Sequence, residues 1–262
     1  MIVGAMKAGT TSLYRDLAEH PEIFLPADKE PNILIDFSEG KSIEAEYIKL
    51  FSGAKAGQLC GEASTNYTKA PKHSGIADTA FSFCGPDLKV IYMRRDPVAR
   101  IVSQYRHECQ HGTIDVSFDE AVRTIPRLID YSRYDWQIEP WIKCFGSDNI
   151  LQINLEDYSL NRQAVINNTV SFLGLPVEKM PSINADKISN SAREAKTISS
   201  PMLRFIVYSK FYQRGLKSLI SDNLRATIRN AILPKPKFEI IEPSTETRDF
   251  INRKLNSSPP MI

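Results

Sequence analysis

The sequence predicts an α/β fold in which one parallel β-sheet is flanked by helices, as a single domain covering residues 1–262. Short runs rich in β-branched and aromatic residues alternate with helical patterns, which is the order expected when helices connect parallel strands. The chain carries 42% hydrophobic and 24% charged residues, ordinary values for a globular domain. It shows no internal repeat and no low-complexity tract.

Four segments have strand character. The third contains the run VIYM and the fourth the run ILQI, and such runs favour strands. The first looks cut short at Met1, so we expect the natural chain to carry a few more residues upstream. The expected strands are Met1–Gly4, Gln58–Glu62, Lys89–Met93 and Ile150–Leu155.

Helical patterns fill most of the remaining chain. One of them ends before Gly174, a suitable residue to follow a helix, with Pro176 just beyond. The tail, residues 234–262, has repeated prolines and a polar finish, which indicates a wrapping or loosely ordered segment and no second domain. The expected helices are Thr11–His20, Ile76–Phe83, Val98–His111, Phe118–Arg123, Tyr134–Phe145, Arg162–Leu173 and Pro201–Gln213.

Charge and cysteine content exclude several classes of protein. A net charge of +2 argues against a general nucleic-acid binder, although a local basic pocket for one nucleotide fits it. No signal peptide and no membrane-spanning run of about 20 apolar residues is visible, which predicts a cytoplasmic protein. The cysteines form no CxxC pair and lack metal-ligand spacing, so we expect no metal site but free thiols at Cys60, Cys84, Cys109 and Cys144.

Residues 2–13 combine a short strand, a glycine-containing turn and the start of a helix. This arrangement aims backbone N–H groups and the positive end of the helix at one point, which predicts an anion site. Gly9 lets the backbone approach the anion closely. Lys7 adds a full positive charge, and hydroxyl groups follow at Thr10, Thr11 and Ser12.

The same loop is P-loop-like, but it is not a Walker A motif. That motif reads GxxxxGK[ST]; Gly4 and Gly9 have its spacing, but Thr10 stands where its lysine belongs. Residues 4–13, GAMKAGTTSL, instead resemble the 5'-phosphosulfate loop of sulfotransferases that use 3'-phosphoadenylyl sulfate (PAPS). A plain strand-to-helix turn is the alternative. The resemblance implies donor contacts from Lys7, Ala8, Gly9, Thr10, Thr11 and Ser12.

A second loop follows the strand at residues 89–93, where two arginines precede a helix. Asp96 and Pro97 suit the first positions of that helix. Positive charge there opposes the helix dipole, so a bound anion explains the arginines better than surface charge does. Arg95 and Ser103 are expected to converge beyond the carboxyl end of the strand, where open α/β sheets bind ligands.

This stretch resembles the 3'-phosphate motif of the same family, in which an Arg-Asp-Pro sequence leads into a helix with a serine. The matching positions are Arg95 and Ser103. A guanidinium group suits a phosphate because it donates two parallel hydrogen bonds. In a later loop, residues 189–193, a looser resemblance implies a donor contact from Arg193; an exposed loop arginine is the alternative.

Between the two loops, residues 29–31 (KEP) resemble the carbohydrate and heparan-sulfate branch of the family, in a bacterial-type soluble member. The resemblance implies that Glu30 is the catalytic base. Since Glu30 precedes a proline, we expect it in an extended segment. His107 is the second candidate for this role, because one branch of the family has a histidine at that helix position. The alternative is a partly exposed helix histidine without a catalytic role. Ala63 replaces the lysine usual in glycan enzymes, which weakens the case for a sulfated polysaccharide.

The resemblance implies transfer of a sulfonate group from PAPS, leaving adenosine 3',5'-bisphosphate (PAP). Lys7 would neutralise charge on the leaving phosphate, and Glu30 would take the acceptor proton. A P-loop kinase or NTPase would need a lysine after Gly9 and a Walker-B-like aspartate, neither of which is visible. A non-catalytic nucleotide-binding protein is the third reading, and the intact Lys7 and Glu30 speak against it. The acceptor and the oligomeric state are not readable from the sequence.

Overall fold

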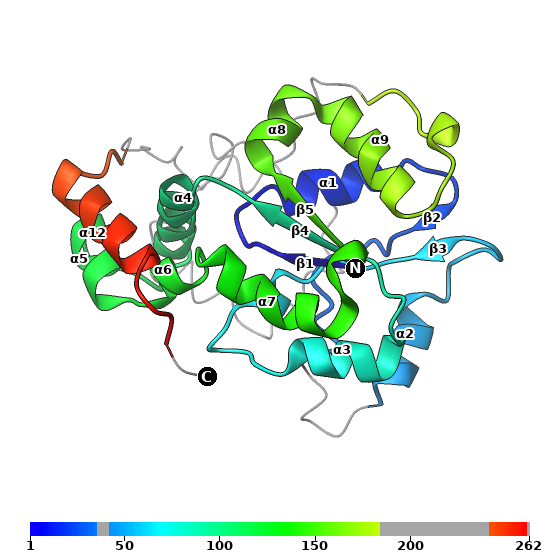
Figure 1. The fold of residues 1–262 in the computed structure, drawn as a ribbon, viewed down its shortest axis with the longest axis horizontal. Helices are drawn as coiled ribbons and strands as arrows, with labels where there is room; N and C mark the ends of the chain where they lie inside the picture. Colours follow the sequence, from blue (N-terminus) through cyan, green and yellow to red (C-terminus); the bar gives the residue numbers. More distant parts are fainter. Residues whose placement is uncertain (36–41, 184–240, 261–262) are drawn as a thin grey trace, which may run out of the picture.

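The computed structural model describes residues 1–35, 42–183 and 241–260. Its central sheet holds three parallel strands in the order β1 (Ile2–Gly4), β4 (Val90–Arg94) and β5 (Ile150–Asn154) (Figure 1). Helices cover both faces, with α1 and α9 on one and α3 and α7 on the other. The predicted α/β class with a parallel sheet is therefore confirmed.

The segment expected as the strand Gln58–Glu62 changes partner along its length. Its first part, β3 (Leu59–Cys60), pairs in parallel with β2 (Ile23–Phe24). Farther on, Ala63 bridges to Ile2 of β1, where the Ile2 N–H donates to the Glu62 carbonyl at 2.9 Å. The chain after β3 therefore runs along the edge of β1 that does not pair with β4.

The predicted helices that fall on described residues are all present, with ends shifted by a few residues, whereas Pro201–Gln213 lies outside the described residues. None of the described helices has the length and apolar character needed to cross a membrane. The α-helices are α1 (Thr10–Leu17), α2 (Ile43–Leu50), α3 (Ile76–Cys84), α4 (Pro97–Gln110), α5 (Phe118–Thr124), α6 (Arg127–Asp130), α7 (Tyr134–Phe145), α8 (Leu155–Leu160), α9 (Arg162–Phe172) and α12 (Thr245–Leu255). Short 3₁₀ turns occur at Thr65–Thr68, Ser147–Asn149 and Val177–Lys179.

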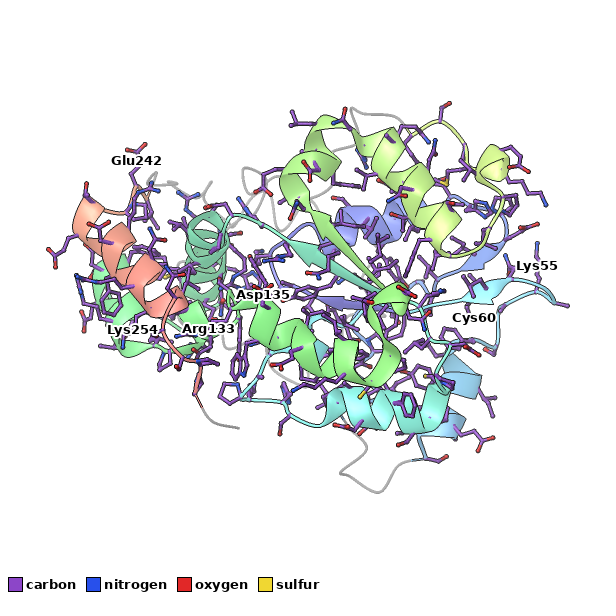
Figure 2. The ribbon with its side chains drawn as sticks, viewed as in Figure 1. Lys55, Cys60, Arg133, Asp135, Glu242 and Lys254 are labelled. Carbon is purple, nitrogen blue, oxygen red and sulfur yellow. The ribbon has the colours of Figure 1, made fainter. Side chains whose placement is uncertain are left out.

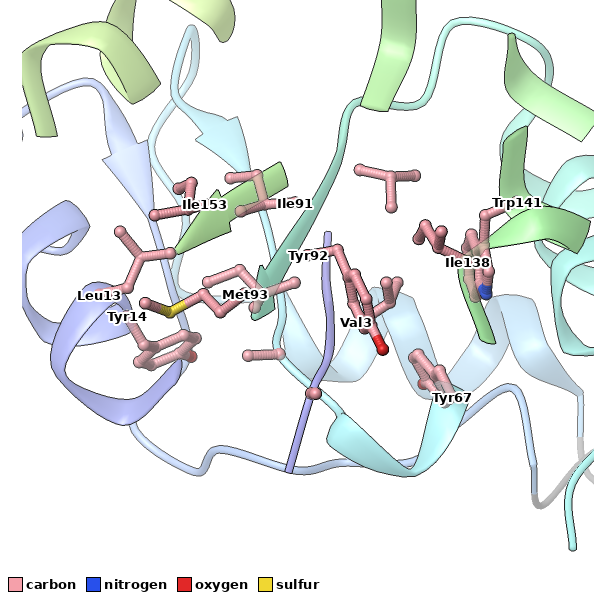
Figure 3. Packing of buried hydrophobic residues seen from close by; sticks show 14 of the residues in the cluster. Val3, Leu13, Tyr14, Tyr67, Ile91, Tyr92, Met93, Ile138, Trp141 and Ile153 are labelled. Carbon is pink, nitrogen blue, oxygen red and sulfur yellow. The ribbon is translucent and has the colours of Figure 1, made fainter. Parts of the chain in front are cut away.

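The main core packs on both faces of the sheet (Figure 3). Successive side chains of a strand point to opposite faces. Ile91 and Met93 accordingly lie with Leu13 of α1, whereas Tyr92 points to the side of Trp141 of α7. All of these side chains are fully or almost fully buried. This packing holds the carboxyl ends of β1 and β4 next to each other.

A second apolar cluster joins α4, α5 and α6 to α12, in which Ile251 is fully buried. The Thr247 hydroxyl donates to Asp119 at 2.5 Å. Arg133 donates to the Leu255 carbonyl at 3.2 Å; Figure 2 labels Arg133 and Lys254, the residue before Leu255. Residues 245–255 of the expected wrapping or loosely ordered tail thus form a packed helix. The Ser244 side chain caps this helix by accepting from the Thr247 N–H at 3.2 Å.

Candidate active site

The loop between β1 and α1 is built around left-handed backbone conformations. Lys7 has φ 67° and Gly9 has φ 89°. Gly9 precedes α1, and its carbonyl accepts from the N–H groups of Ser12 and Leu13 at 3.0 and 3.3 Å. The N–H groups before these cannot find an acceptor inside the helix, so they face the loop. The predicted anion site therefore has the required local geometry.

Both glycines of this loop sit where a side chain does not fit. A Cβ on Gly9 would lie 2.6 Å from Cδ1 of Leu155, and a Cβ on Gly4 would lie 2.0 Å from Oγ1 of Thr68. Thr68 also donates to the Val3 carbonyl at 2.8 Å, which holds it against the loop. The spacing of the two glycines is thus set by close packing as well as by backbone conformation.

Lys7 and Arg95 meet at this loop. The Arg95 Nη1 donates to the Lys7 carbonyl at 3.3 Å. Burial, assisted by the positive charge of Arg95, lowers the pKa of Lys7. Neither cation forms an ion pair with any carboxylate in the described part of the chain. Two neighbouring cations without a counter-ion indicate a site for a bound anion.

Arg94 points to the other face of the sheet. Its Nη1 lies 3.2 Å from a carboxylate oxygen of Asp135 on α7, and its guanidinium lies over the Tyr134 ring. Because neighbouring strand residues alternate, only Arg95 faces Lys7. The arginine that contacts the loop of Lys7 is thus Arg95, and its role in donor binding stays a prediction.

Helix α4 begins as predicted. The Asp96 side chain accepts from the Ala99 N–H at 2.7 Å, and Pro97 occupies the first turn. Ser103 is half-buried on this helix, and its role in donor binding stays a prediction. His107 lies one turn farther along α4. Burial lowers the pKa of His107 to about 4, and the nearby positive charge of Lys7 acts in the same direction. The imidazole is therefore neutral at pH 7.

Glu30 lies on the segment after β2. Its carboxylate accepts from the Thr65 N–H at 2.7 Å and from the Thr65 hydroxyl at 3.2 Å, and it pairs with Lys29. The expectation of an extended residue was wrong, because Glu30 has φ 65°. Its N–H donates to the Ala63 carbonyl at 2.9 Å. This contact and the Thr65 bonds hold Glu30 in a conformation that the following proline alone does not favour.

A polar chain beside Glu30 was missed in the sequence analysis. The Asn32 amide donates to the Glu30 carbonyl at 2.8 Å, and the Asn66 amide donates to Asn32 Oδ1 at 3.0 Å. The Lys69 ammonium then donates to Asn66 Oδ1 at 2.6 Å. Over the described ranges, the non-glycine residues with positive φ are Lys7, Glu30 and Asn32. Such backbone conformations are concentrated at functional sites, which supports the placement of the candidate active site around these residues.

The remaining site predictions concern Arg193 and the absence of a metal. Arg193 lies outside the described residues, so its donor contact stays a prediction. In the parts of the chain that the structure describes, no group of three or more His, Cys, Asp or Glu residues is placed to hold a metal ion.

The sulfotransferase domain family model matches residues 1–219. Mouse heparan sulfate glucosamine 3-O-sulfotransferase 3B1 is 26% identical over 184 residues, which cover 67% of this chain and 45% of the relative. Mouse carbohydrate sulfotransferase 15 is 24% identical over 242 residues, which cover 66% of this chain and 43% of the relative. The chain thus spans less than half the length of these curated relatives.

Solved structures show the same fold. A sulfotransferase from Alicyclobacillus acidocaldarius superimposes with a TM-score of 0.59 at 26% identity, over 71% of this chain and 85% of that one. The sulfotransferase domain of the curacin biosynthetic pathway gives a TM-score of 0.50 at 16% identity, over 99% and 97% of the two chains. Because the family model covers most of the sequence, the protein belongs to the sulfotransferase domain family, whose members are transferases with PAPS as sulfonate donor.

Proposed function

We propose that this protein transfers the sulfonate group of PAPS to a hydroxyl group, or in second place an amine, of an acceptor such as a glycan, a lipid or a small metabolite. The observation that carries the proposal is the contact between Lys7, in the loop after β1, and Arg95, directly after β4. Among the described residues neither cation pairs with a carboxylate. Family membership favours this function over the kinase and the non-catalytic readings.

The reaction forms one bond and breaks one. An acceptor oxygen attacks the sulfur atom, the bond between sulfur and the bridging phosphate oxygen breaks, and PAP leaves. Lys7 lies in the loop between β1 and α1, where its positive charge stabilises the negative charge that builds on the leaving phosphate. The acceptor proton passes to a base, for which Glu30 is the first candidate and the neutral His107 the second.

Donor binding is tested with a matched pair of arginine variants. PAP binds only the folded protein, so it raises Tm by mass action, and ADP, which lacks the 3'-phosphate, raises it far less. Arg95→Ala removes most of the PAP-induced shift, whereas Arg94→Ala, on the other face of the sheet, keeps it. Equal shifts with PAP and ADP in the wild-type protein would contradict the assignment of Arg95 and Ser103 to the 3'-phosphate.

The base is tested with Glu30→Gln and His107→Ala, after a screen of PAPS-loaded protein against glycan, lipid and small-molecule acceptors. Removing a general base costs about 10²–10⁴ in rate. Glu30→Gln keeps the side-chain shape but cannot take a proton at neutral pH, so turnover falls within that range while PAP affinity is nearly unchanged. Loss of turnover in His107→Ala, with Glu30→Gln within a few-fold of wild type, would assign the base to His107.

A further inference from the structure

Lys69 is a cation whose contacts, in the part of the chain that the structure describes, are with neutral groups. It is half-buried, and its ammonium donates to the neutral amide of Asn66 at 2.6 Å and lies 5.8 Å from the centre of the Tyr131 ring. Among the described residues it forms no ion pair. Two carboxylates are near enough to affect its titration, Glu30 and Glu108.

Both of these carboxylates already have basic partners of their own. Glu30 is paired with Lys29, and Glu108 forms an ion pair with Arg127. Burial lowers the pKa of Lys69 to about 8, and the charges of Lys72 and the buried Arg100 act in the same direction. Removing a charge from water without a counter-ion is unfavourable, so a ligand that supplied the opposite charge would be stabilised beside Lys69.

The position of Lys69 assigns this ligand to the acceptor side. The polar chain through Asn66 and Asn32 connects Lys69 to the backbone of Glu30, the proposed base. The donor cations Lys7 and Arg95 belong instead to the loops that follow β1 and β4. The positive charge of Lys69 also reaches His107, the second candidate base.

Building on the proposed function, we propose that Lys69 binds an acidic group, a carboxylate or a sulfate, on the acceptor, and that Asn32 and Asn66 position its ammonium. The acceptor is thus an anionic molecule that presents its reacting hydroxyl near Glu30 and its acidic group near Lys69. The ammonium has three donors, and the Asn66 amide takes one, which leaves two for the acidic group.

The test uses Lys69→Met, which keeps the length of the side chain but removes its charge, and Lys72→Met as the matched control on the exposed neighbour. The probes are a heparosan hexasaccharide, its carboxyl-reduced neutral form, and an O-sulfated form of that reduced sugar. Binding of each probe to PAP-saturated protein is measured by calorimetry at 150 mM salt, which weakens non-specific attraction between exposed charges. The three arms separate carboxylate from sulfate recognition.

The wild-type protein should bind at least one acidic hexasaccharide about 10- to 100-fold more tightly than the neutral one, the range expected for a hydrogen bond to a charged group. Lys69→Met removes this preference, Lys72→Met keeps it, and Lys69→Arg retains part of it. The same preference should appear in KM rather than kcat for any probe that is sulfonated.

Three results would overturn the inference: no preference for the acidic probes in the wild-type protein, an unchanged preference in Lys69→Met, or a tenfold loss of PAP affinity in Lys69→Met, which would move Lys69 to the donor site. Failure of wild-type protein to bind PAP at all would instead count against the proposed function, so the two failures are distinguishable. Thermal unfolding of each variant in the absence of ligand checks that it is folded.

Discussion

Replacing Gly9 with alanine tests whether the loop before α1 is the donor site. Gly9 has φ 89°, a conformation that costs an alanine about 1–2 kcal/mol. The new Cβ would also lie 2.6 Å from Cδ1 of Leu155, so that leucine must leave its preferred rotamer, at a cost of about 0.5–1.5 kcal/mol. Together these effects lower the free energy of unfolding by roughly 2–3 kcal/mol. For a domain of this size, Tm falls by about 4–12 °C.

Gly75→Ala is the matched control. Gly75 precedes α3 as Gly9 precedes α1, and its φ is 71°, but a Cβ there meets no atom within 4 Å. Gly75→Ala should therefore lower the free energy of unfolding by the backbone cost alone, about 1–2 kcal/mol, without a steric clash and without disturbing the loop between β1 and α1. We expect Gly75→Ala to keep wild-type affinity for PAP.

The assay combines thermal unfolding with calorimetric titration of PAP. In Gly9→Ala the displaced loop no longer directs its N–H groups to one point, so PAP affinity falls at least tenfold, about 1.4 kcal/mol. If Gly9→Ala bound PAP within twofold of wild type, with a stability loss equal to that of Gly75→Ala, the donor would not approach Gly9 and the site would lie elsewhere.

Three further predictions follow from the described contacts. Lys7→Ala lowers kcat more than it weakens PAP binding, because its charge acts on the leaving phosphate during transfer; full turnover at saturating PAPS would contradict this. Asp16→Asn breaks the buried ion pair with Arg162, whose atoms lie 2.7 Å apart, and should lower the free energy of unfolding measured in urea by about 3–5 kcal/mol. Lys143→Ala, which removes an exposed pair with Glu139, should lower it by at most about 1 kcal/mol. His107 should not titrate between pH 5 and 8 in NMR spectra, because its pKa in the folded protein is about 4. Since the unfolded value is near 6.5, the unfolded chain binds a proton that the folded protein does not, and the free energy of unfolding falls as the pH drops from about 6.5 to 4. His107→Gln should remove this pH dependence.

Local patterns were enough to predict the backbone of the two loops that we propose bind the donor. The strand–turn–helix of residues 2–13 and the Asp96–Pro97 helix start depend on contacts among neighbouring residues, and both are present in the structure. These features need no knowledge of distant segments, because hydrogen bonds and backbone sterics within a few residues decide them.

The proposed acceptor side depends on segments far apart in the chain. Glu30 adopts φ 65° against the preference set by the next proline, because Ala63 and Thr65 hold its backbone and carboxylate. No local pattern pointed to Lys69, for which we propose an acceptor contact. Burial by neighbouring segments lowers the pKa of Lys69, and its ammonium donates to Asn66. Desolvation and charge pairing exist only once the chain is packed, so the composition of this half of the site was decided by the tertiary structure and not by any short stretch of sequence.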